Sequence, residues 1–392
     1  MILPGPAAGV VSASGARRWQ GGHPWIFRSD VRQLPEGGAG PVAVHDARGK
    51  PLGIALWSPT SEIAFRLLDA DPDARIDVSW WAARIARAAH RRAPVAASCN
   101  AYRVVHAEAD GCPSLIVDRY GAYLVVQLLS AGLEACREDI IAALIEALSP
   151  EGILARNDAS VRGREGLPRV VETLAGSVPR EVEVEEHGIR YLAAPHDGQK
   201  TGAFLDQREN RVRIGSLARG EALDCFSYHG SFALHLARTA DRVTALDSSA
   251  IALARAEANA RLNHLTNLRF VEANAFEWLR DAERRGQQYD TIVLDPPAFA
   301  KSRASVASAI RGYKEVNLRA MRLLTSGGLL FTASCSYHIT KPLFLEMLQA
   351  AASDANRRLG LMELRGQPYD HPEVLTIPET GYLKAAIVEA LD

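Results

Sequence analysis

The chain has 392 residues, a formal net charge of −1, 47% hydrophobic and 23% charged residues, which is the composition of an ordinary globular protein. Its length exceeds what one hydrophobic core usually supports, so we expect two or three domains. No apolar stretch approaches the ~20 residues that span a membrane, and the N-terminus lacks the basic lead and long apolar run of a signal peptide. The five cysteines form no Cys-x-x-Cys pair, which argues against a disulfide framework or a zinc site. We therefore expect a cytoplasmic protein without a bound metal and without membrane association.

Residues 1–77 predict a small β-rich domain. Gly, Pro and Asp residues separate short apolar runs at Val42–Val44, Ile54–Trp57 and Ile63–Leu67, a pattern typical of strands joined by turns. Residues 78–190 predict a central α+β domain. Its expected elements are an Arg-rich amphipathic helix at Val78–Arg92, strands at Leu115–Val117 and Tyr123–Leu129, and a helix at Glu138–Leu148.

Residues 191–392 alternate strand and helix patterns at regular spacing. The expected strands are Ala222–Asp224, Val243–Leu246, Leu268–Val271, Thr291–Leu294, Leu329–Thr332, Leu361–Leu364 and Leu383–Val388. The expected helices are Ser231–Ala240, Ala250–Asn263, Phe276–Arg284, Tyr313–Leu324 and Pro342–Ala355. This alternation predicts an α/β Rossmann-like domain with a parallel sheet, to which the last two strands add an antiparallel edge to give seven strands.

Ligands of such a sheet bind beyond the carboxyl ends of its strands. The segments directly after the first five strands are Asp224–Gly230, Asp247-Ser248-Ser249, Asn274-Ala275, Asp295-Pro296-Pro297 and Ser334-Cys335-Ser336. Asp247 is placed to accept hydrogen bonds from both ribose hydroxyls, and Gly230 permits close approach of the backbone. Asn274 is expected at the adenine edge, with Ala275 beside it. A purely structural role, such as capping the next helix, is the alternative for each residue alone.

The first of these loops lacks both the three-glycine dinucleotide fingerprint and a Walker lysine. A pyrophosphate requires more backbone N–H groups than this loop offers, so the sequence favours S-adenosylmethionine (SAM) over NAD. The expected cofactor-binding residues of the core are Asp224, Phe226, Gly230, Asp247, Ser248, Asn274, Ala275 and Asp295.

Asp295 and Cys335 are the expected catalytic residues. Two prolines follow Asp295 in the segment Asp295–Lys301 and stiffen the backbone around its carboxyl group. A thiolate at Cys335 would add to carbon 6 of a pyrimidine and make carbon 5 nucleophilic enough to accept a methyl group. Asp295 is placed to protonate or hydrogen-bond ring N3, which makes that addition easier. The alternative for Cys335 is a small buried core residue.

The chain resembles the large-subunit (23S) ribosomal RNA 5-methylcytosine methyltransferases that carry an N-terminal PUA domain. The matching segments are Gly21–Phe27, Glu108–Gly111, Leu115–Gly121, Arg162–Leu167, the loop Gly198–Arg211 and the five segments after the strands. The resemblance implies that Lys200, Gln207 and Arg208 help to hold the cofactor. It also implies that Cys335 is the nucleophile and that the PUA region binds 23S ribosomal RNA.

Two other functions stay open from the sequence. The first is a methyltransferase that acts on an exocyclic amino group of adenine or guanine through Asp295-Pro296-Pro297. The second is a non-catalytic RNA-binding protein. The sequence leaves the oligomeric state undecided, with a homodimer as the candidate assembly.

Overall fold

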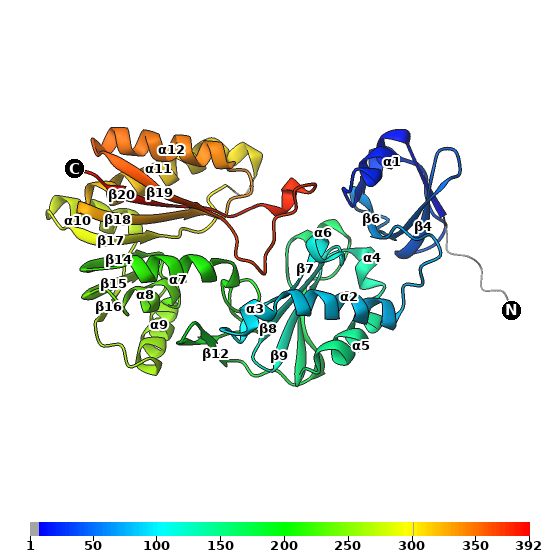
Figure 1. The fold of residues 1–392 in the computed structure, drawn as a ribbon, viewed down its shortest axis with the longest axis horizontal. Helices are drawn as coiled ribbons and strands as arrows, with labels where there is room; N and C mark the ends of the chain where they lie inside the picture. The colour runs from blue at the N-terminus through cyan, green and yellow to red at the C-terminus, as the bar shows by residue number, and fades with distance from the viewer. Residues whose placement is uncertain (1–7, 301) are drawn as a thin grey trace. The chain divides into compact units, whose positions relative to one another are not determined.

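The computed structural model describes residues 8–300 and 302–392, which fold into two compact units (Figure 1). The first unit contains the described residues up to Val184 together with 193–205 and 369–380. The second contains residues 185–192, 206–368 and 381–392. The described helices all lack the combination of length and hydrophobicity needed to cross a bilayer. Lys301, the last residue of the predicted segment Asp295–Lys301, lies outside the described residues.

The first unit begins with a six-stranded sheet. The strands, in spatial order, are β2 (Trp25–Phe27), β6 (Ile63–Asp69), β5 (Pro51–Trp57), β4 (Gly40–Asp46), β1 (Ala8–Val11) and β3 (Val31–Gln33). Helix α1 (Ala13–Gln20) follows β1 and is capped by Ser12, whose hydroxyl accepts a hydrogen bond from the Gly15 amide. Alternate residues of β4, including Val42 and Val44, are buried with Trp57 and Phe65.

A five-stranded sheet completes the first unit. Its order is β11 (Val170–Gly176), β10 (Gly152–Asn157), β9 (Tyr123–Leu128), β8 (Leu115–Tyr120) and β7 (Ala101–His106). Its helices are α2 (Val78–Arg91), α3 (Ala93–Ala96), α4 (Ala131–Glu134), α5 (Arg137–Leu148) and α6 (Val161–Arg164). Leu56 and Leu68 of the first sheet pack in one apolar cluster with Trp81 of α2. The predicted division at residues 77 and 190 is finer than the two units and stays a prediction.

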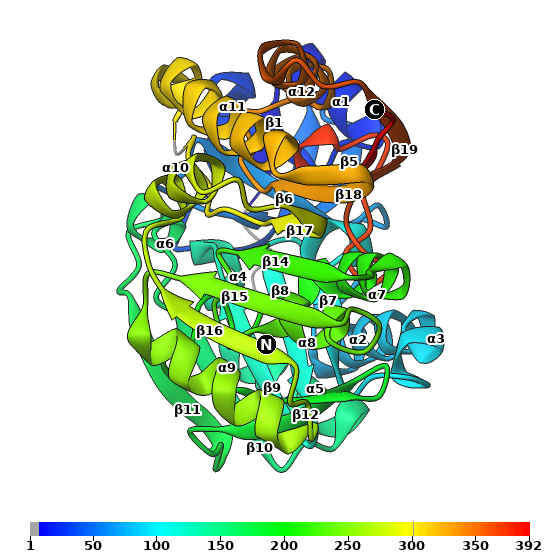
Figure 2. The same ribbon diagram turned by 90° about the vertical axis from the view of Figure 1, so that its left-hand side faces the viewer.

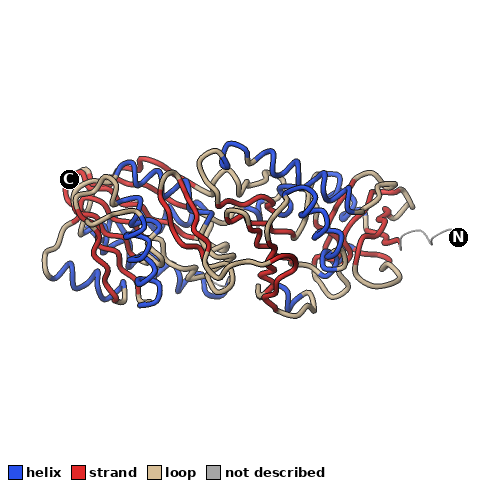
Figure 3. Tube along the Cα trace, turned by 90° about the horizontal axis from the view of Figure 1, so that it is seen from below, coloured by secondary structure: helices blue, strands red, loops and turns tan. Residues whose placement is uncertain are grey.

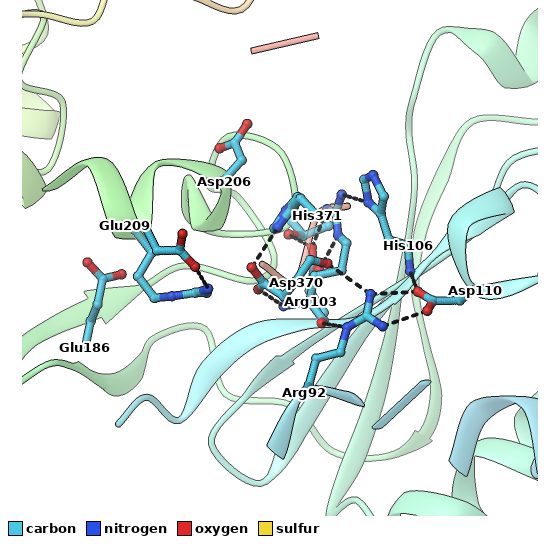
Figure 4. A network of polar contacts seen from close by, with 12 residues as sticks. Arg92, Arg103, His106, Asp110, Glu186, Asp206, Glu209, Asp370 and His371 are labelled. Atoms are coloured by element: carbon cyan, nitrogen blue, oxygen red, sulfur yellow. Dashed lines mark hydrogen bonds and ion pairs between the residues drawn. The ribbon is translucent and has the colours of Figure 1, made fainter. Parts of the chain in front are cut away.

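A buried polar network fixes residues 369–380 within the first unit (Figure 4). Arg92 donates to both carboxylate oxygens of Asp110, at 2.6 and 2.7 Å, and also to the backbone oxygen of Asp370, at 3.0 Å. The Asp370 carboxylate in turn accepts a hydrogen bond from the Arg103 amide at 2.8 Å. Because these groups are buried, each needs the others as partners, and the segment between the last two strands of the chain is held firmly.

The second unit is built on a seven-stranded sheet. The order is β16 (Leu268–Glu272), β15 (Arg242–Asp247), β14 (Glu221–Cys225), β17 (Tyr289–Leu294), β18 (Leu324–Ser334), β20 (Lys384–Ala390) and β19 (Leu359–Arg365). The first five strands are parallel, and β20 pairs antiparallel with both β18 and β19. The predicted α/β fold with an antiparallel edge is confirmed.

Helices cover both faces of this sheet (Figures 1 and 2). One apolar cluster joins the sheet to α10 (Ala275–Arg284), α11 (Val306–Arg322) and α12 (Lys341–Ala355), and another joins it to α7 (Arg208–Leu217) and α8 (Ser231–Leu236). Helix α9 (Ala250–Leu262) lies beside β15 and β16. The strands of this unit run between its helices in Figure 3. The hairpin β12 (Val182–Glu186) and β13 (Ile189–Ala193) is where the chain first enters the second unit, before residues 193–205 return to the first.

The largest differences from the predicted boundaries in the second unit are in α11, α8 and β18, which begins at Leu324 instead of Leu329. Helix α11 begins at Val306 instead of Tyr313. It follows directly on a short 3-10 helix, Arg303–Ser305, which is capped by a capping box of Ser302 and Ser305 that the apolar pattern does not contain. Helix α8 ends at Leu236 instead of Ala240. Helix α7 was not predicted. Three of its buried residues, Arg208, Asn210 and Arg211, are polar.

The side chains of Glu186, Arg211 and His235 form a buried polar cluster in the second unit. Arg211 Nε donates to Glu186 Oε1 at 2.8 Å, and His235 Nε2 lies 3.1 Å from the same oxygen. Burial alone would raise the pKa of Glu186, but the Arg211 guanidinium and the His235 ring hold this pKa well below its usual value.

We expect Arg211→Met to lower the free energy of unfolding by about 3–5 kcal/mol, because it leaves a buried carboxylate without its counter-charge. Urea titration measures this loss. The control is Arg238→Met, the same substitution at an exposed position, which we expect to cost less than about 1 kcal/mol. Equal losses in the two variants would contradict a special contribution from the buried pair.

Candidate functional site

The five parallel strands of the second unit end at one edge of the sheet. Cys225, the last residue of β14, pairs with Leu246 of β15 on one side and with Leu294 of β17 on the other. Leu294 pairs with Thr332 of β18. The loops that follow these strands therefore lie next to one another, as the sequence analysis requires.

Asp224 lies at the base of the first loop and is fully buried. Its Oδ2 accepts hydrogen bonds from Ser227 Oγ at 2.7 Å and from the Ala233 amide at 2.9 Å, while its Oδ1 receives none from the described residues. Burial raises the pKa of Asp224 to about 7 despite these bonds, and the charges of Asp295 and Asp247 act in the same direction. The three carboxyl groups thus share one region of the site.

The backbone of the first loop is tightly turned. Phe226 and Tyr228 have φ of +65° and +53°, an uncommon conformation for residues with a side chain. Gly230 has φ of +83°, and a Cβ added there would lie 2.9 Å from the Cβ of Ala256 in α9. Only glycine allows the loop to approach α9 so closely.

Asp247 joins the first loop to the second. Its Oδ2 accepts from the Tyr228 amide at 2.8 Å and its Oδ1 accepts from the Ser249 amide at 2.9 Å. Each carboxylate oxygen retains a second lone pair, which is what a pair of ribose hydroxyls requires. Ser248, between the two bonded segments, is exposed.

Asn274 and Ala275 lie at the start of α10. The Asn274 Oδ1 accepts hydrogen bonds from the amides of Phe276 and Glu277, at 2.9 and 3.4 Å, so that this side chain caps the helix. Ala275 is buried in the apolar core. Asn274 therefore has the helix-capping role that was the alternative from the sequence. Binding of a cofactor by Asn274 or Ala275 stays a prediction.

The loops after β17 and β18 are bonded to each other. Ser336 Oγ accepts from the Ala300 amide at 3.1 Å and lies 2.9 Å from the hydroxyl of Tyr313 in α11. Asp295 begins the first of these loops and Cys335 lies in the second, both partly exposed. Carboxyl and thiol thus leave neighbouring parallel strands at the same edge of the sheet.

Cys335 differs from the other cysteines in its exposure. Cys99, Cys112, Cys136 and Cys225 are buried, whereas Cys335 is partly exposed. Cys335 continues the row of alternate residues Phe331 and Ala333, which faces α7 and α8. Burial raises the pKa of Cys112 and of Cys136 to about 12 and that of Cys225 well above its usual value, so these groups stay protonated thiols.

The loop Gly198–Arg211 is divided between the units. Gln207 belongs to the second unit, where its Nε2 donates to Asp295 Oδ1 at 2.8 Å. Arg208 follows as the first residue of α7 and is buried. Lys200 belongs to the first unit, where its ammonium group lies 4.6 Å from the ring centroid of Phe204.

Two residues of this region were not singled out from the sequence. Lys384 of β20 is 3% exposed and donates to the backbone oxygens of Ser336 and Tyr382, at 2.7 and 2.8 Å. A lone lysine within the apolar strand Leu383–Val388 was the available signal. Asn210 of α7 is the second, and it contacts Gln207.

In the part of the chain that the structure describes, no group of three or more His, Cys, Asp or Glu side chains has the arrangement of a metal site.

Comparison with known proteins identifies the class. Residues 160–388 match the family model of S-adenosylmethionine-dependent methyltransferases, and residues 10–70 match that of PUA-like domains. Ribosomal RNA large subunit methyltransferase I of Tolumonas auensis is 40% identical to this chain, with 94% of this chain and 96% of the relative covered. The protein of the same name from Shewanella amazonensis is 39% identical, with coverages of 93% and 94%.

A solved structure of the same fold is SMU.776, assigned as a methyltransferase and complexed with SAH. It has a TM-score of 0.84 and 22% identity, and the match covers 98% of this chain and 100% of that one.

The fold and the family matches define a SAM-dependent methyltransferase with an N-terminal PUA-like domain, and the predicted class of enzyme and its cofactor are confirmed. More narrowly, the chain belongs to the family of ribosomal RNA large subunit methyltransferase I.

The residues of the site fit SAM. The buried Oδ1 of Asp224 and the two carboxylate oxygens of Asp247 provide acceptors at the carboxyl ends of the strands, which is the region of such a sheet where ligands bind.

We expect Gly230→Ala to weaken SAM binding about tenfold or more, equal to about 1.4 kcal/mol, because the added methyl group pushes the first loop away from α9. Calorimetric titration with SAM measures the affinity. Gly286→Ala is the matched control, since Gly286 also has a positive φ of +66° but has no atom within 4 Å of the added Cβ. Unchanged affinity in Gly230→Ala would show that the cofactor does not depend on this loop.

Proposed function

We propose that this enzyme methylates carbon 5 of a cytosine in large-subunit (23S) ribosomal RNA in the cytoplasm, with Cys335 as the covalent nucleophile. The observation that supports this most strongly is the partly exposed thiol of Cys335, while the other four cysteines are buried. Its neighbour Ser336 accepts a hydrogen bond from Ala300, which lies in the loop that Asp295 begins. The names of the relatives support ribosomal RNA as the substrate.

The proposal divides the residues into three roles. Cys335 and Asp295 act on the target base, and the PUA-like region binds RNA. The proposed cofactor residues are Lys200, Gln207, Arg208, Asp224, Phe226, Gly230, Asp247, Ser248, Asn274, Ala275 and Asp295. The homodimer considered from the sequence stays a prediction.

When bound, SAM supplies an electrophilic methyl group. The Cys335 thiolate adds to carbon 6 of the base and forms a sulfur–carbon bond, which places electron density on carbon 5. Asp295 holds the hydrogen-bonding edge of the base during this addition. Once carbon 5 carries the methyl group, a general base removes its proton. The electron pair of that carbon–hydrogen bond re-forms the double bond between carbons 5 and 6 as the bond from carbon 6 to Cys335 breaks, which restores the aromatic ring and the thiolate.

The target base must leave its stack to reach the two side chains, at a cost of a few kcal/mol. The ring of Phe299 contacts that of Tyr313 at a centroid distance of 4.6 Å beside the loop of Asp295. Because Tyr313 is fully buried, only the partly exposed ring of Phe299 offers a surface on which a flipped base would stack.

We expect Cys335→Ala to reduce methyl transfer to cytosine-containing ribosomal RNA by roughly 10³-fold or more, since no other group replaces the nucleophile. Transfer of a labelled methyl group measures the rate. We also expect RNA that contains 5-fluorocytosine to form a covalent complex with the wild-type enzyme, because fluorine at carbon 5 blocks the elimination step, but none with the variant.

The matched control is Cys136→Ala, which removes a buried thiol from the first unit and should leave the rate within about twofold, as for a site without contact to the chemistry. Full activity of Cys335→Ala would favour methylation of an exocyclic amino group, which needs no covalent intermediate. Absence of SAM binding in the wild-type protein would favour a non-catalytic RNA-binding protein.

A further inference from the structure

Four side chains of the second unit form a hydrogen-bonded relay that ends on Asp295. Arg365, in β19, donates from Nε to Asn210 Oδ1 at 2.8 Å. Asn210 donates from Nδ2 to Gln207 Oε1 at 2.6 Å, and Gln207 donates from Nε2 to Asp295 Oδ1 at 2.8 Å. The relay therefore reaches from the antiparallel edge of the sheet to the loop after β17.

The direction of every bond in the relay follows from Arg365. A guanidinium group has only donors, so the oxygen of the Asn210 amide must face it. The nitrogen of Asn210 then faces Gln207, where the amide oxygen must accept. This leaves the nitrogen of Gln207 to face Asp295. The reverse orientation of either amide would place two acceptors or two donors against each other.

Both amides are held against rotation. Asn210 and Gln207 are each 2% exposed, so water has little access to replace a lost partner. The Asn210 nitrogen also donates to the backbone oxygen of Gly366 at 3.3 Å. At the far end, Arg365 forms an ion pair with Glu363 at 2.7 Å, and Glu363 also accepts from Arg213. The two amides are buried and hydrogen-bonded on both sides, so each of them has one arrangement.

We propose that Asn210 and Gln207 are positioning residues that hold Asp295 as an oriented acceptor, and that the enzyme thereby selects a target base that presents an N–H group to this carboxylate. An ionised carboxylate only accepts hydrogen bonds. The exocyclic amine of cytosine is such a donor, whereas the oxygen that uracil carries at the same position would be repelled.

This inference deepens the proposed function and rests on it for the identity of the base. It also changes the role expected for Asp295 from the sequence. An acceptor held by Gln207 binds the amine of the cytosine edge, instead of giving a proton to ring N3. The orientation of Asp295 itself can be tested without RNA.

The first test reverses the relay. Asn210→Asp keeps the size of the side chain and still accepts from Arg365, but it has no donor for Gln207, whose amide must turn its oxygen toward Asp295. Asp295→Asn then supplies a donor to that oxygen. Asp295→Asn raises the equilibrium constant of unfolding by a factor that urea titration measures in each background of a double-mutant cycle. We expect this factor to be at least tenfold smaller in the Asn210→Asp background than in the wild-type background.

Equal costs of Asp295→Asn in the two backgrounds would overturn the relay. If Asn210→Asp does not fold, Gln207→Glu replaces it in the same cycle. This variant still accepts from Asn210 and presents a second carboxylate oxygen to Asp295, so Asp295→Asn should again relieve a repulsion. Absence of coupling in this cycle would equally overturn the proposal.

The second test measures catalysis. We expect Asn210→Asp to lower kcat/KM for cytosine-containing RNA by about 10- to 100-fold and to reduce the preference for cytosine over uracil at the same site. The control is Asn267→Asp, which loses two bonds to backbone oxygens at the opposite edge of the sheet, ahead of β16, and should leave kcat/KM within twofold.

A wild-type enzyme that does not methylate cytosine, together with coupling in the cycle, would contradict the proposed function and support the relay. A wild-type enzyme that methylates cytosine, together with an unchanged preference in Asn210→Asp, would overturn the selection of the base.

Discussion

The parallel pairing of β14, β17 and β18 is the constraint on which the site depends. Because parallel strands end at the same edge, Asp224, Asp295 and Cys335 are brought together although up to 111 residues separate them along the chain. The sheet is fixed in turn by apolar clusters on both faces, one with α10, α11 and α12 and one with α7 and α8. To separate these residues, a strand that is buried on both faces would have to change its pairing register, which is energetically unfavourable.

The loops at this edge are rigid for a different reason. Asp247 receives amides from two loops, and Ser336 is bonded from Ala300 on one side while Lys384 binds its backbone oxygen. These are polar groups in partly or fully buried positions, where a broken hydrogen bond is not replaced by water. The loops thus contribute a preformed frame at the carboxyl ends of the strands.

The sequence contains the strands and the order of their terminal residues, because apolar runs and the acids after them are local patterns. It also distinguishes Cys335 from the other cysteines by its place after a strand. In the structure Cys335 differs from them too, since it is partly exposed and they are buried. The relay of Asn210 and Arg365 could not be predicted, since the two residues are 155 positions apart and each is ordinary by itself. Helix α7 was missed because its buried face is polar, so that hydrophobic periodicity, the main signal of an amphipathic helix, is weak there.

The acids of the site explain physically why a sulfonium cofactor suits this fold better than a dinucleotide. Asp224, Asp247 and Asp295 lie close enough for the charges of the latter two to raise the pKa of Asp224. A pyrophosphate placed among them would add negative charge to a region that already opposes it, whereas a cationic sulfonium and an ammonium group reduce the repulsion. The environments of these acids differ. Asp224 is buried and bonded to the first loop, while Asp295 is partly exposed and accepts a hydrogen bond from Gln207. Similar carboxyl groups on neighbouring strands thus acquire different properties, because the protein bonds each of them differently.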